Sequence, residues 1–559
     1  MGPTRVVARL AAWGFVVLAL AAALVAWRVI SASADLALGR ERLLAGDTGA
    51  ADVAFARAER WPAASAEARA GRAVAAARAG HAVSETVPLA DLEVLAPEAL
   101  VLSSLDEGHL DAAAALADLA RRAGHPMGSV YAAALALERS DERTARSIVS
   151  ESGVPLSSRG LGTRLRRALE ARSAGAETLL LDRHGELVAT VVRGAIVAET
   201  GLAPFLAGVL ERLPGRPGGA AVRLSIDLGL SRVARAALGD RRGSIVLVEP
   251  RTGEVLAAVS DERTAAAGDA SAFTQRREPA SIAKLITATA AYRAGLDADA
   301  EIRRMTCTGV ERYGGKPLWC AFPAGPLEGL DHALAVSCNV AFANLGVRLG
   351  AVRMLGEYRR WGFDAGAGAL LGSAGRIHTL PRTARQLADL SVGLGLVDVT
   401  PLHAAFLAAT VANDGRLPEP RLVTGACGPL GLTGEALPLP PGRDVLEPGL
   451  ARRLLQAMKA VGEQGTGAGL APLGFPVAMK TGTASERGRG YHVNYIGLGP
   501  LPDPAVAFCV RVTDERTSPA VTAAAREVTR ALLTALTQHR RALGPSTRRR
   551  GPAGAATVR

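Results

Sequence analysis

The chain is poor in lysine: four of its 65 basic residues are lysines and the rest are arginines. Arginine does not lose its proton in a protein, so this abundance of positive charge supplies almost no groups able to act as bases. A lysine amine can become a base when it is buried or crowded by positive charge. Two of the four, Lys284 and Lys480, lie in the segments 281–284 and 480–483, which also contain hydroxyl side chains. Lysines retained in such segments indicate that these two side chains take part in a chemical reaction.

Metal-ligand patterns are also scarce. The nine histidines have no metal-binding spacing, and among five cysteines only Cys307 and Cys320 form a close pair, so we predict no metal site. Glycines between these two cysteines can bring the thiols together, which predicts a disulfide in an oxidising compartment, with two free loop thiols as the alternative. We interpret Cys338 and Cys509 as packed residues.

The segment 281–284 places a hydroxyl and an amine three residues apart. The apolar run around it, 282–291, predicts a buried helix, and positions i and i+3 share a helix face. We therefore expect the neutral Lys284 amine to reach the Ser281 hydroxyl and to take its proton. Pro279 predicts that Ser281 opens the helix, where backbone N–H groups favour negative charge. An ordinary pair on a helix surface is the alternative.

Two further motifs follow in a fixed order. Ser337 and Asn339 form a Ser-x-Asn motif in an apolar stretch, and Lys480, Thr481 and Gly482 form a Lys-Thr-Gly motif. The order Ser-x-x-Lys, Ser-x-Asn, Lys-Thr-Gly is that of penicilloyl serine transferases. The chain thus resembles the transpeptidase domain of class B penicillin-binding proteins.

The resemblance covers residues 223–538, which is enough chain for a complete hydrophobic core. Residues 244–248 and 255–259 resemble the first β-hairpin of that domain, and 506–512 is typical of a strand. The implied fold class is α+β, β-lactamase/transpeptidase-like, with an antiparallel sheet flanked by helices. A transmembrane helix and a helical repeat-like region are expected to precede it.

The resemblance implies catalytic roles at the matching positions. Ser281 is expected to attack a D-alanyl-D-alanine bond of a peptidoglycan stem peptide, with Lys284 accepting its proton. D-alanine would leave an acyl-enzyme, which an amine of a neighbouring stem peptide would attack. Ser337 would relay protons, Asn339 would bind the substrate backbone, and the charge of Lys480 would help to keep Lys284 neutral. β-Lactams are implied as covalent inhibitors, and no cofactor is expected.

Substrate-binding residues are implied in the same way. Lys480, Thr481 and Thr483 are expected to engage the terminal carboxylate of the substrate. The backbone N–H groups of Ser281 and Thr483 would stabilise the oxyanion. Gly482, lacking a side chain, would let a strand edge approach the ligand.

Two positions depart from the family pattern. Ala280 stands where a glycine commonly precedes the nucleophile, and Leu394 stands where a glutamine is frequent. Neither touches a reacting atom in the implied mechanism. The resemblance therefore leaves open the rate of the implied reaction and its substrate preference.

The amino terminus predicts a membrane anchor. Residues 10–27 are uncharged and mostly apolar, and at 1.5 Å per residue they span about 27 Å, close to a bilayer core of roughly 30 Å. We predict a cytoplasmic segment at 1–9 and a single-pass anchor at 10–30 in the bacterial inner membrane, with the rest periplasmic. A cleaved signal peptide is the alternative, because 32–34 suits a signal peptidase.

Residues 31–175 are alanine-rich and predict helices. The spacing of small residues over 46–80, with a looser repetition over 108–124, resembles tetratricopeptide repeats, and an ordinary tightly packed helix pair is the alternative. Residues 176–222 are predicted to be a linker in which 179–189 resembles a remnant of the class B pedestal. No glycosyltransferase pattern is present, so we expect a monofunctional chain.

The net charge of +12 would suit nucleic acid, but the predicted location excludes that partner. An anionic wall or membrane surface, or a solvated basic face, explains the charge instead. The basic tail 539–559 is predicted to be disordered. A glycosyltransferase in the membrane is a further expected partner.

Three functions stay open at this point. The first is a membrane-anchored D,D-transpeptidase that cross-links peptidoglycan. The second is a hydrolase with the same acyl-enzyme, either a D,D-carboxypeptidase or a β-lactamase. The third is a non-catalytic penicillin-binding sensor or scaffold. Sequence does not separate transfer from hydrolysis, because water and an amine approach the same acyl carbon.

Overall fold

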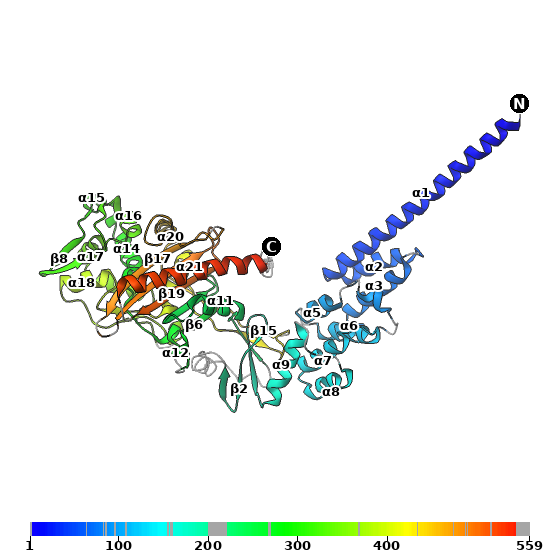
Figure 1. Cartoon of the computed structure of the whole chain (residues 1–559), viewed down its shortest axis with the longest axis horizontal. Helices are drawn as coiled ribbons and strands as arrows, with labels where there is room; N and C mark the ends of the chain where they lie inside the picture. Colours follow the sequence, from blue (N-terminus) through cyan, green and yellow to red (C-terminus); the bar gives the residue numbers. More distant parts are fainter. Residues whose placement is uncertain are drawn as a thin grey trace, which may run out of the picture. The chain divides into compact units, whose positions relative to one another are not determined.

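The structure is a computed structural model of the whole chain (Figure 1). It describes residues 3–543 apart from 199–220 and short gaps at 63, 82, 84–86, 94, 96, 107–108, 154–155, 157–159, 267–269, 367–368, 433, 473, 487, 489 and 515–516. Side chains are described from Leu24 onward. The basic tail after residue 543 and much of the predicted linker therefore lie outside the described residues.

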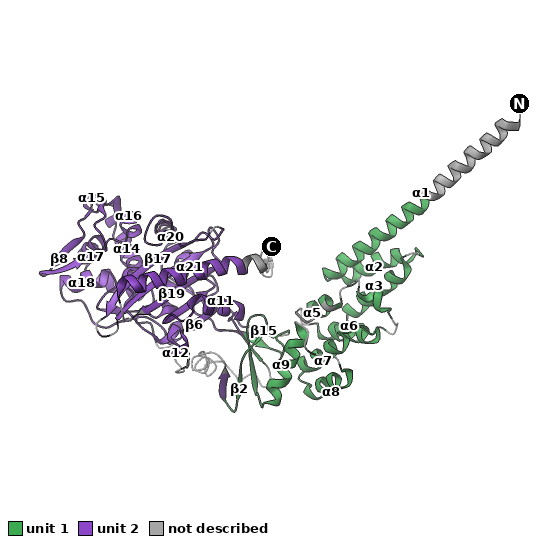
Figure 2. Cartoon of the chain, viewed as in Figure 1, with its two compact units in different colours: residues 1–194, 217–223, 425–436 green, residues 195–216, 224–424, 437–559 purple. Residues whose placement is uncertain are grey.

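The chain forms two compact units (Figure 2). Unit 1 comprises residues 1–194, 217–223 and 425–436. Unit 2 comprises the remaining residues, 195–216, 224–424 and 437–559. The segment 425–436, which the sequence groups with the transpeptidase domain, thus packs with the amino-terminal unit.

Unit 1 begins with consecutive helices, as the alanine-rich composition predicts. Two of these helices are capped by exposed aspartates. Asp47 Oδ1 accepts the Ala50 N–H at the start of α2, and Asp141 Oδ1 accepts the Thr144 N–H at the start of α8. The helices are α1 (Pro3–Leu44), α2 (Thr48–Glu59), α3 (Ser65–Arg78), α4 (Leu89–Glu93), α5 (Pro97–Asp106), α6 (Leu110–Arg122), α7 (Gly128–Glu138), α8 (Glu142–Ser152) and α9 (Leu161–Ser173).

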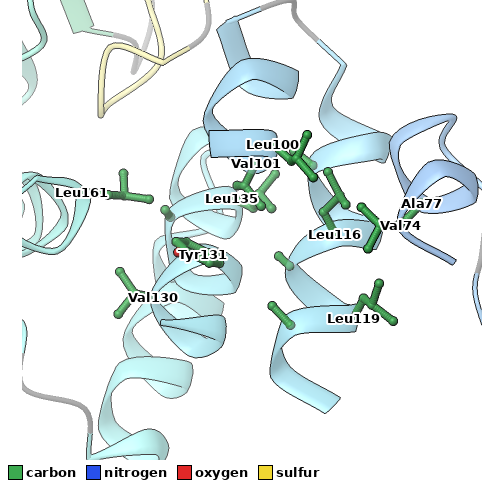
Figure 3. Close-up of a cluster of buried hydrophobic side chains, with 14 of the residues drawn as sticks. Val74, Ala77, Leu100, Val101, Leu116, Leu119, Val130, Tyr131, Leu135 and Leu161 are labelled. Atoms are coloured by element: carbon green, nitrogen blue, oxygen red, sulfur yellow. The ribbon is translucent and has the colours of Figure 1, made fainter. Parts of the chain in front are cut away.

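Small residues allow these helices to pack closely. The Phe55 ring of α2 is fully buried, and a Cβ added at Gly39 of α1 or Gly71 of α3 would lie 2.6 or 2.5 Å from that ring. The glycines therefore form the slot that holds the ring. Figure 3 shows the core beyond this point, where leucine, valine and tyrosine side chains of α3, α5, α6, α7 and α9 converge.

The strands of unit 1 belong to a six-stranded sheet with the order β15-β14-β4-β1-β2-β3. β1 and β2 form an antiparallel hairpin, and β4 runs parallel to β1. The turn of the hairpin is the predicted pedestal remnant: Asp182 is buried, and its Oδ1 accepts the backbone N–H groups of His184 and Glu186. The strands are β1 (Thr178–Leu181), β2 (Leu187–Val192), β4 (Ala221–Leu224), β14 (Val423–Cys427) and β15 (Gly434–Ala436).

The centre of unit 2 is an antiparallel five-stranded sheet in the order β17-β18-β19-β5-β6. The predicted hairpin at 244–248 and 255–259 and the strand at 506–512 are confirmed, as is the α+β transpeptidase fold. β17 lies at one edge, which leaves one of its sides open. The strands are β5 (Gly243–Val248), β6 (Val255–Ser260), β17 (Ala478–Glu486), β18 (Gly490–Gly499) and β19 (Val506–Asp514).

Helices cover both faces of this sheet. On one face, α11 (Leu228–Leu238) and α21 (Ser518–Leu543) bury leucine, valine and alanine side chains against alternate strand residues such as Val493, Tyr495 and Val510. On the other face, α19 (Pro401–Ala412) contacts β5, β18 and β19 and is almost entirely buried. This mostly apolar helix, with α11 on the opposite face, explains why strand β5 is buried at every position.

Unit 2 contains further helices and short strands. The longer helices are α14 (Lys284–Arg293), α16 (Gly329–Ala335), α17 (Asn339–Arg360), α18 (Ala384–Ser391) and α20 (Pro448–Glu463). The remaining elements are β3 (Ala195–Ala198), α12 (Glu262–Ala266), α13 (Ser271–Thr274), η1 (Ala280–Ala283), η2 (Leu296–Ala298), α15 (Ala300–Arg303), β7 (Thr306–Cys307), β8 (Val310–Tyr313), β9 (Lys316–Trp319), β10 (Gly325–Pro326), η3 (Ala369–Gly372), β11 (Arg376–Ile377), β12 (Val397–Asp398), β13 (Arg416–Leu417) and β16 (Arg443–Asp444).

The predicted membrane anchor at 10–30 falls largely on residues whose side chains lie outside the description. In the part of the chain that is described, no helix has the length and apolar character needed to cross a bilayer.

Candidate active site

The candidate nucleophile lies in a short 3₁₀ turn. The predicted helix over 282–291 forms, but its first turn is η1 (Ala280–Ala283), and the α-helix α14 begins at Lys284. Side chains at i and i+3 eclipse one another in a 3₁₀ turn, so this geometry keeps Ser281 and Lys284 on one side. Ser281 is half-buried, whereas Lys284 is fully buried.

The Lys284 amine is held by the Ser-x-Asn motif. Its Nζ lies 2.6 Å from the Ser337 carbonyl oxygen, 2.6 Å from Asn339 Oδ1 and 3.2 Å from Ser337 Oγ. Among the described residues the hydrogen bonds of this amine go to those groups and not to Ser281. Catalytic hydrogen bonds often form only when a substrate closes the site. The lack of a hydrogen bond between Lys284 and Ser281 is therefore compatible with the predicted proton transfer between them.

The Ser337 hydroxyl connects the two buried lysines. Lys480 Nζ donates to Ser337 Oγ at 2.9 Å and to the Thr481 carbonyl at 3.0 Å. Lys284 Nζ also lies 3.2 Å from the same Ser337 Oγ, so both amines contact one hydroxyl. The arrangement is therefore a continuous path for a proton between two amines.

The Asn339 side chain is engaged at both ends. Its Nδ2 donates to the Trp319 carbonyl at 2.6 Å, which fixes the amide so that Oδ1 faces Lys284. The sequence predicts that Asn339 binds the substrate backbone, whereas this geometry gives it the additional task of orienting the base. Asn339 is the first residue of helix α17 and lies two residues after Ser337.

The open edge of β17 lies against the nucleophile turn. A Cβ added at Gly482 would lie 2.8 Å from the Pro279 carbonyl oxygen and 3.2 Å from the Ser281 nitrogen. Glycine allows this close approach to the nucleophile turn, whereas the predicted approach of the strand edge to a ligand stays a prediction. Thr481 Oγ1 lies 2.6 Å from Thr466 Oγ1, and Thr483 is exposed on the same strand.

Burial dominates the electrostatics of both lysines. It lowers the pKa of Lys284 to about 7, while the nearby thiols of Cys338, Cys320 and Cys307 oppose that shift. Burial also lowers the pKa of Lys480, and the charge of Lys284 lowers it further. Since the repulsion between two amines is mutual, the pair holds fewer than two protons near neutral pH. A base that is neutral near pH 7 suits general-base catalysis.

The pKa of Lys284 predicts the pH dependence of acylation. Below pH 7 the amine is charged and has no lone pair, so the rate of acylation by a penicillin should fall about tenfold per pH unit. Above pH 7 the amine is neutral and the rate should level off. Stopped-flow acylation rates between pH 5 and 9 measure this profile, and a rate that is constant from pH 5 to 7 would contradict the assigned base.

Ala280 has a left-handed backbone, with φ of +52°. This explains why glycine suits the position before the nucleophile, since a Cβ in this region costs about 1–2 kcal/mol. Its N–H donates to the Gly393 carbonyl at 2.9 Å, and a Cβ added at Gly393 would lie 2.3 Å from the Ala280 oxygen. The departure from the family pattern is therefore a strained alanine and not a different backbone.

Relief of this strain gives a stability prediction. Ala280→Gly should raise the free energy of unfolding by up to about 1 kcal/mol, because the removed strain exceeds the added flexibility of the unfolded chain. Ala236→Gly, at an exposed position of α11, is the matched control and should lower it by about 1 kcal/mol. Denaturant unfolding measures both, and equal destabilisation by the two changes would refute the strain.

Buried polar residues that sequence reasoning missed support the nucleophile segment. Arg511 of β19 is fully buried and donates to Asn494 Oδ1 and to the carbonyls of Gln275 and Val399, at 2.7, 2.8 and 3.0 Å. Burial lowers its pKa only to about 10, so it stays charged. The sign of this buried arginine in the sequence is its position within the apolar run 506–512.

His492 is buried beside the same segment. Its Nε2 lies 2.8 Å from the Glu278 carbonyl, and the Glu278 backbone N–H donates to Glu486 at 2.8 Å. These bonds connect β17 and β18 to the residues that precede Ser281. They fix the position of the nucleophile turn against the sheet.

The predicted disulfide is not formed in the structure, where Cys307 and Cys320 are free thiols with their sulfurs 3.5 Å apart. The pairing thus stays a prediction. Cys338, interpreted from the sequence as a packed residue, is buried but also lies 3.7 Å from the Cys320 sulfur. The fold therefore brings three thiols together where the sequence suggests two.

Comparisons with known proteins agree with this geometry. The family model described as "Penicillin binding protein transpeptidase domain" matches residues 243–534, more than half of the chain. The chain is 33% identical over 312 residues to the peptidoglycan D,D-transpeptidase PbpA of Mycolicibacterium smegmatis, covering 49% of this chain and 62% of that protein. It is 30% identical over 389 residues to PbpA of Mycobacterium tuberculosis, covering 60% of this chain and 78% of that protein.

Solved structures give the same result. The imipenem acyl-enzyme complex of penicillin-binding protein A from M. tuberculosis matches with a TM-score of 0.54 and 26% identity, over 64% of this chain and 98% of that one. Its ceftriaxone acyl-enzyme complex matches with a TM-score of 0.55 and 25% identity, over the same shares. With the three motifs joined around one serine, the chain belongs to the penicillin-binding protein transpeptidase family.

Proposed function

We propose that the chain is a serine D,D-transpeptidase that cross-links peptidoglycan stem peptides and is acylated by β-lactams. The observation that carries the proposal is the Ser337 hydroxyl, which connects the two buried amines of Lys284 and Lys480 beside the turn that holds Ser281. Such a connected pair of amines has no evident structural purpose, because burying two lysines costs stability.

The acylation step uses this path. Ser281 Oγ forms a bond to the carbonyl carbon of the penultimate D-alanine, and its proton moves to the neutral Lys284 amine. The C–N bond to the terminal D-alanine then breaks, and the proton passes through Ser337 to the leaving amine. The backbone N–H groups of Ser281 and Thr483, on adjoining segments, would stabilise the oxyanion. The product is an ester on Ser281.

The second step reverses these roles. The amine of a neighbouring stem peptide attacks the ester carbonyl and gives up a proton along the Ser337 path. The Ser281–acyl bond breaks, and the hydroxyl regains its proton from Lys284. Lys480, Thr481 and Thr483 lie where they could bind the carboxylate of the donor peptide, and a bound carboxylate would favour the charged form of Lys480.

The location is part of the proposal. The apolar run at 10–27 supports a single-pass anchor in the inner membrane, with the catalytic unit on the periplasmic side. Since the sequence has no glycosyltransferase pattern, a separate membrane glycosyltransferase is the expected partner. It would supply the glycan strands whose peptides this chain joins.

An acceptor experiment tests transfer directly. The full chain is incubated with a peptide ending in D-alanyl-D-alanine, with and without a labelled D-amino acid as the amine acceptor. We expect a labelled transfer product that increases with acceptor concentration, and no product with Ser281→Ala. Release of D-alanine by water alone, unaffected by acceptor, would instead make the enzyme a carboxypeptidase. No release, with stable penicillin labelling, would identify a sensor.

A further inference from the structure

Three thiols meet beside the catalytic motif from separate parts of the sequence. Cys307 ends the short strand β7, Cys320 follows strand β9, and Cys338 directly precedes helix α17. All three sulfurs lie within 4.8 Å of one another. Cys307 and Cys338 are buried, whereas Cys320 is partly exposed, so the group can be reached from solvent.

The spacing of the sulfurs is that of metal ligands. Zinc–sulfur bonds of about 2.3 Å in a tetrahedral site hold neighbouring sulfurs about 3.8 Å apart. Here Cys320 Sγ lies 3.5 Å from Cys307 Sγ and 3.7 Å from Cys338 Sγ. A metal ion could therefore bind with shifts of a few tenths of an ångström in the ligand atoms.

The backbone around the sulfurs favours negative charge on them. The N–H groups of Asn339 and Val340 donate to Cys320 Sγ at 3.1 and 3.4 Å, and that of Ala341 donates to Cys338 Sγ at 3.4 Å. These are the first N–H groups of helix α17, which has a kink at Gly350, and the dipole of its first part adds to the effect. Thiolates, and not thiols, are the ligands of metal ions.

We propose that Cys307, Cys320 and Cys338 form a binding site for a thiophilic d¹⁰ cation, with Zn²⁺ as the representative ion. Binding releases three thiol protons to solvent and forms three metal–sulfur bonds. No fourth cysteine, histidine or carboxylate belongs to this group within the described ranges, which leaves a coordination position for water. The site is separate from the reacting atoms and does not depend on the proposed transfer reaction.

A bound ion would stabilise the catalytic motif. Cys338 lies between Ser337, which connects the two lysines, and Asn339, which orients Lys284. Metal–sulfur bonds would join this motif to β7 and to the loop after β9, whose Trp319 carbonyl accepts from Asn339. The ion would thus position Ser337 and Asn339 without touching the substrate.

A cadmium titration tests the site, because cadmium–thiolate bonds absorb ultraviolet light in proportion to their number. The full chain is reduced with a phosphine, freed of metal with a chelator and titrated with Cd²⁺. We expect saturation at about one ion per chain with three thiolate bonds, and binding at least roughly tenfold weaker in Cys320→Ser. Zn²⁺ should displace Cd²⁺ and raise the Tm.

Cys427→Ser is the matched control, because Cys427 is a buried thiol that no group of three includes. It should keep the full absorbance, and circular dichroism confirms that each variant is folded. Cys307→Ala, which removes a different ligand, should reproduce the Cys320→Ser result. If the fully reduced wild type binds no Cd²⁺, or if Cys427→Ser weakens binding equally, the proposal fails and the predicted disulfide becomes the account of these cysteines.

Discussion

Lys284→Arg should lower the rate of penicillin acylation on the order of a thousandfold, the usual contribution of a general base. The substitution keeps a long basic side chain, and the guanidinium can still donate to Ser337 and Asn339. It cannot release its proton at any relevant pH, so Ser281 would lose its proton acceptor. Acylation rates with a fluorescent penicillin measure the loss.

Lys459→Arg provides the matched control, because it makes the same exchange at a partly exposed lysine that pairs with Glu463 on α20. This variant should acylate at the wild-type rate. The pH profile of Lys284→Arg should also lose the inflection near pH 7. If Lys284→Arg kept more than about a tenth of the wild-type rate, Lys284 would not be the base assigned by this geometry.

Gly482→Ala should reduce acylation about a hundredfold, the effect of displacing a catalytic group by roughly 1 Å. The added methyl group would lie 2.8 Å from the Pro279 carbonyl oxygen, so β17 and the turn carrying Ser281 must separate. Lys480 and Thr483 move with β17, away from the reacting carbonyl. Acylation kinetics with the fluorescent penicillin again provide the measurement.

Gly356→Ala is the corresponding control. A Cβ at this position of α17 meets no atom within 4 Å, and alanine favours a helix, so stability and acylation should both be retained. A wild-type acylation rate in Gly482→Ala would show that the strand edge and the nucleophile turn are farther apart than described.

The sequence identifies the candidate site residues because they lie in short motifs within regular elements. Lys284 is three residues from Ser281, and Lys480 and Gly482 share a strand, so local geometry places each pair. The hairpin at 244–248 and 255–259 follows from its apolar strands and the turn between them. The scarcity of lysine makes the two buried amines conspicuous in the sequence.

Other features depend on contacts between distant segments, which local patterns do not contain. Cys338 joins Cys320 only because helix α17 begins beside the loop after β9. Arg511 finds its partners at Gln275, Asn494 and Val399, far apart in the chain. Such sites follow from tertiary packing, so the sequence showed only an arginine and a cysteine in apolar runs.

The strand pairing of unit 1 has the same origin. Residues 425–436 return to the amino-terminal unit, where Cys427 pairs with Gly434 and the Leu430 N–H donates to the buried Glu138 at 2.7 Å. Nothing in the composition of 425–436 distinguishes it from the surrounding transpeptidase region. Parallel and long-range pairings are set by the whole fold.

Mass spectrometry of the penicillin adduct tests the central claim most directly. The full chain is incubated with benzylpenicillin, digested, and the modified peptide is sequenced. We predict one stable penicilloyl group per chain, on Ser281, and none in Ser281→Ala. A penicilloyl group on another residue, or an unchanged adduct in Ser281→Ala, would contradict the assignment of the nucleophile and the mechanism built on it.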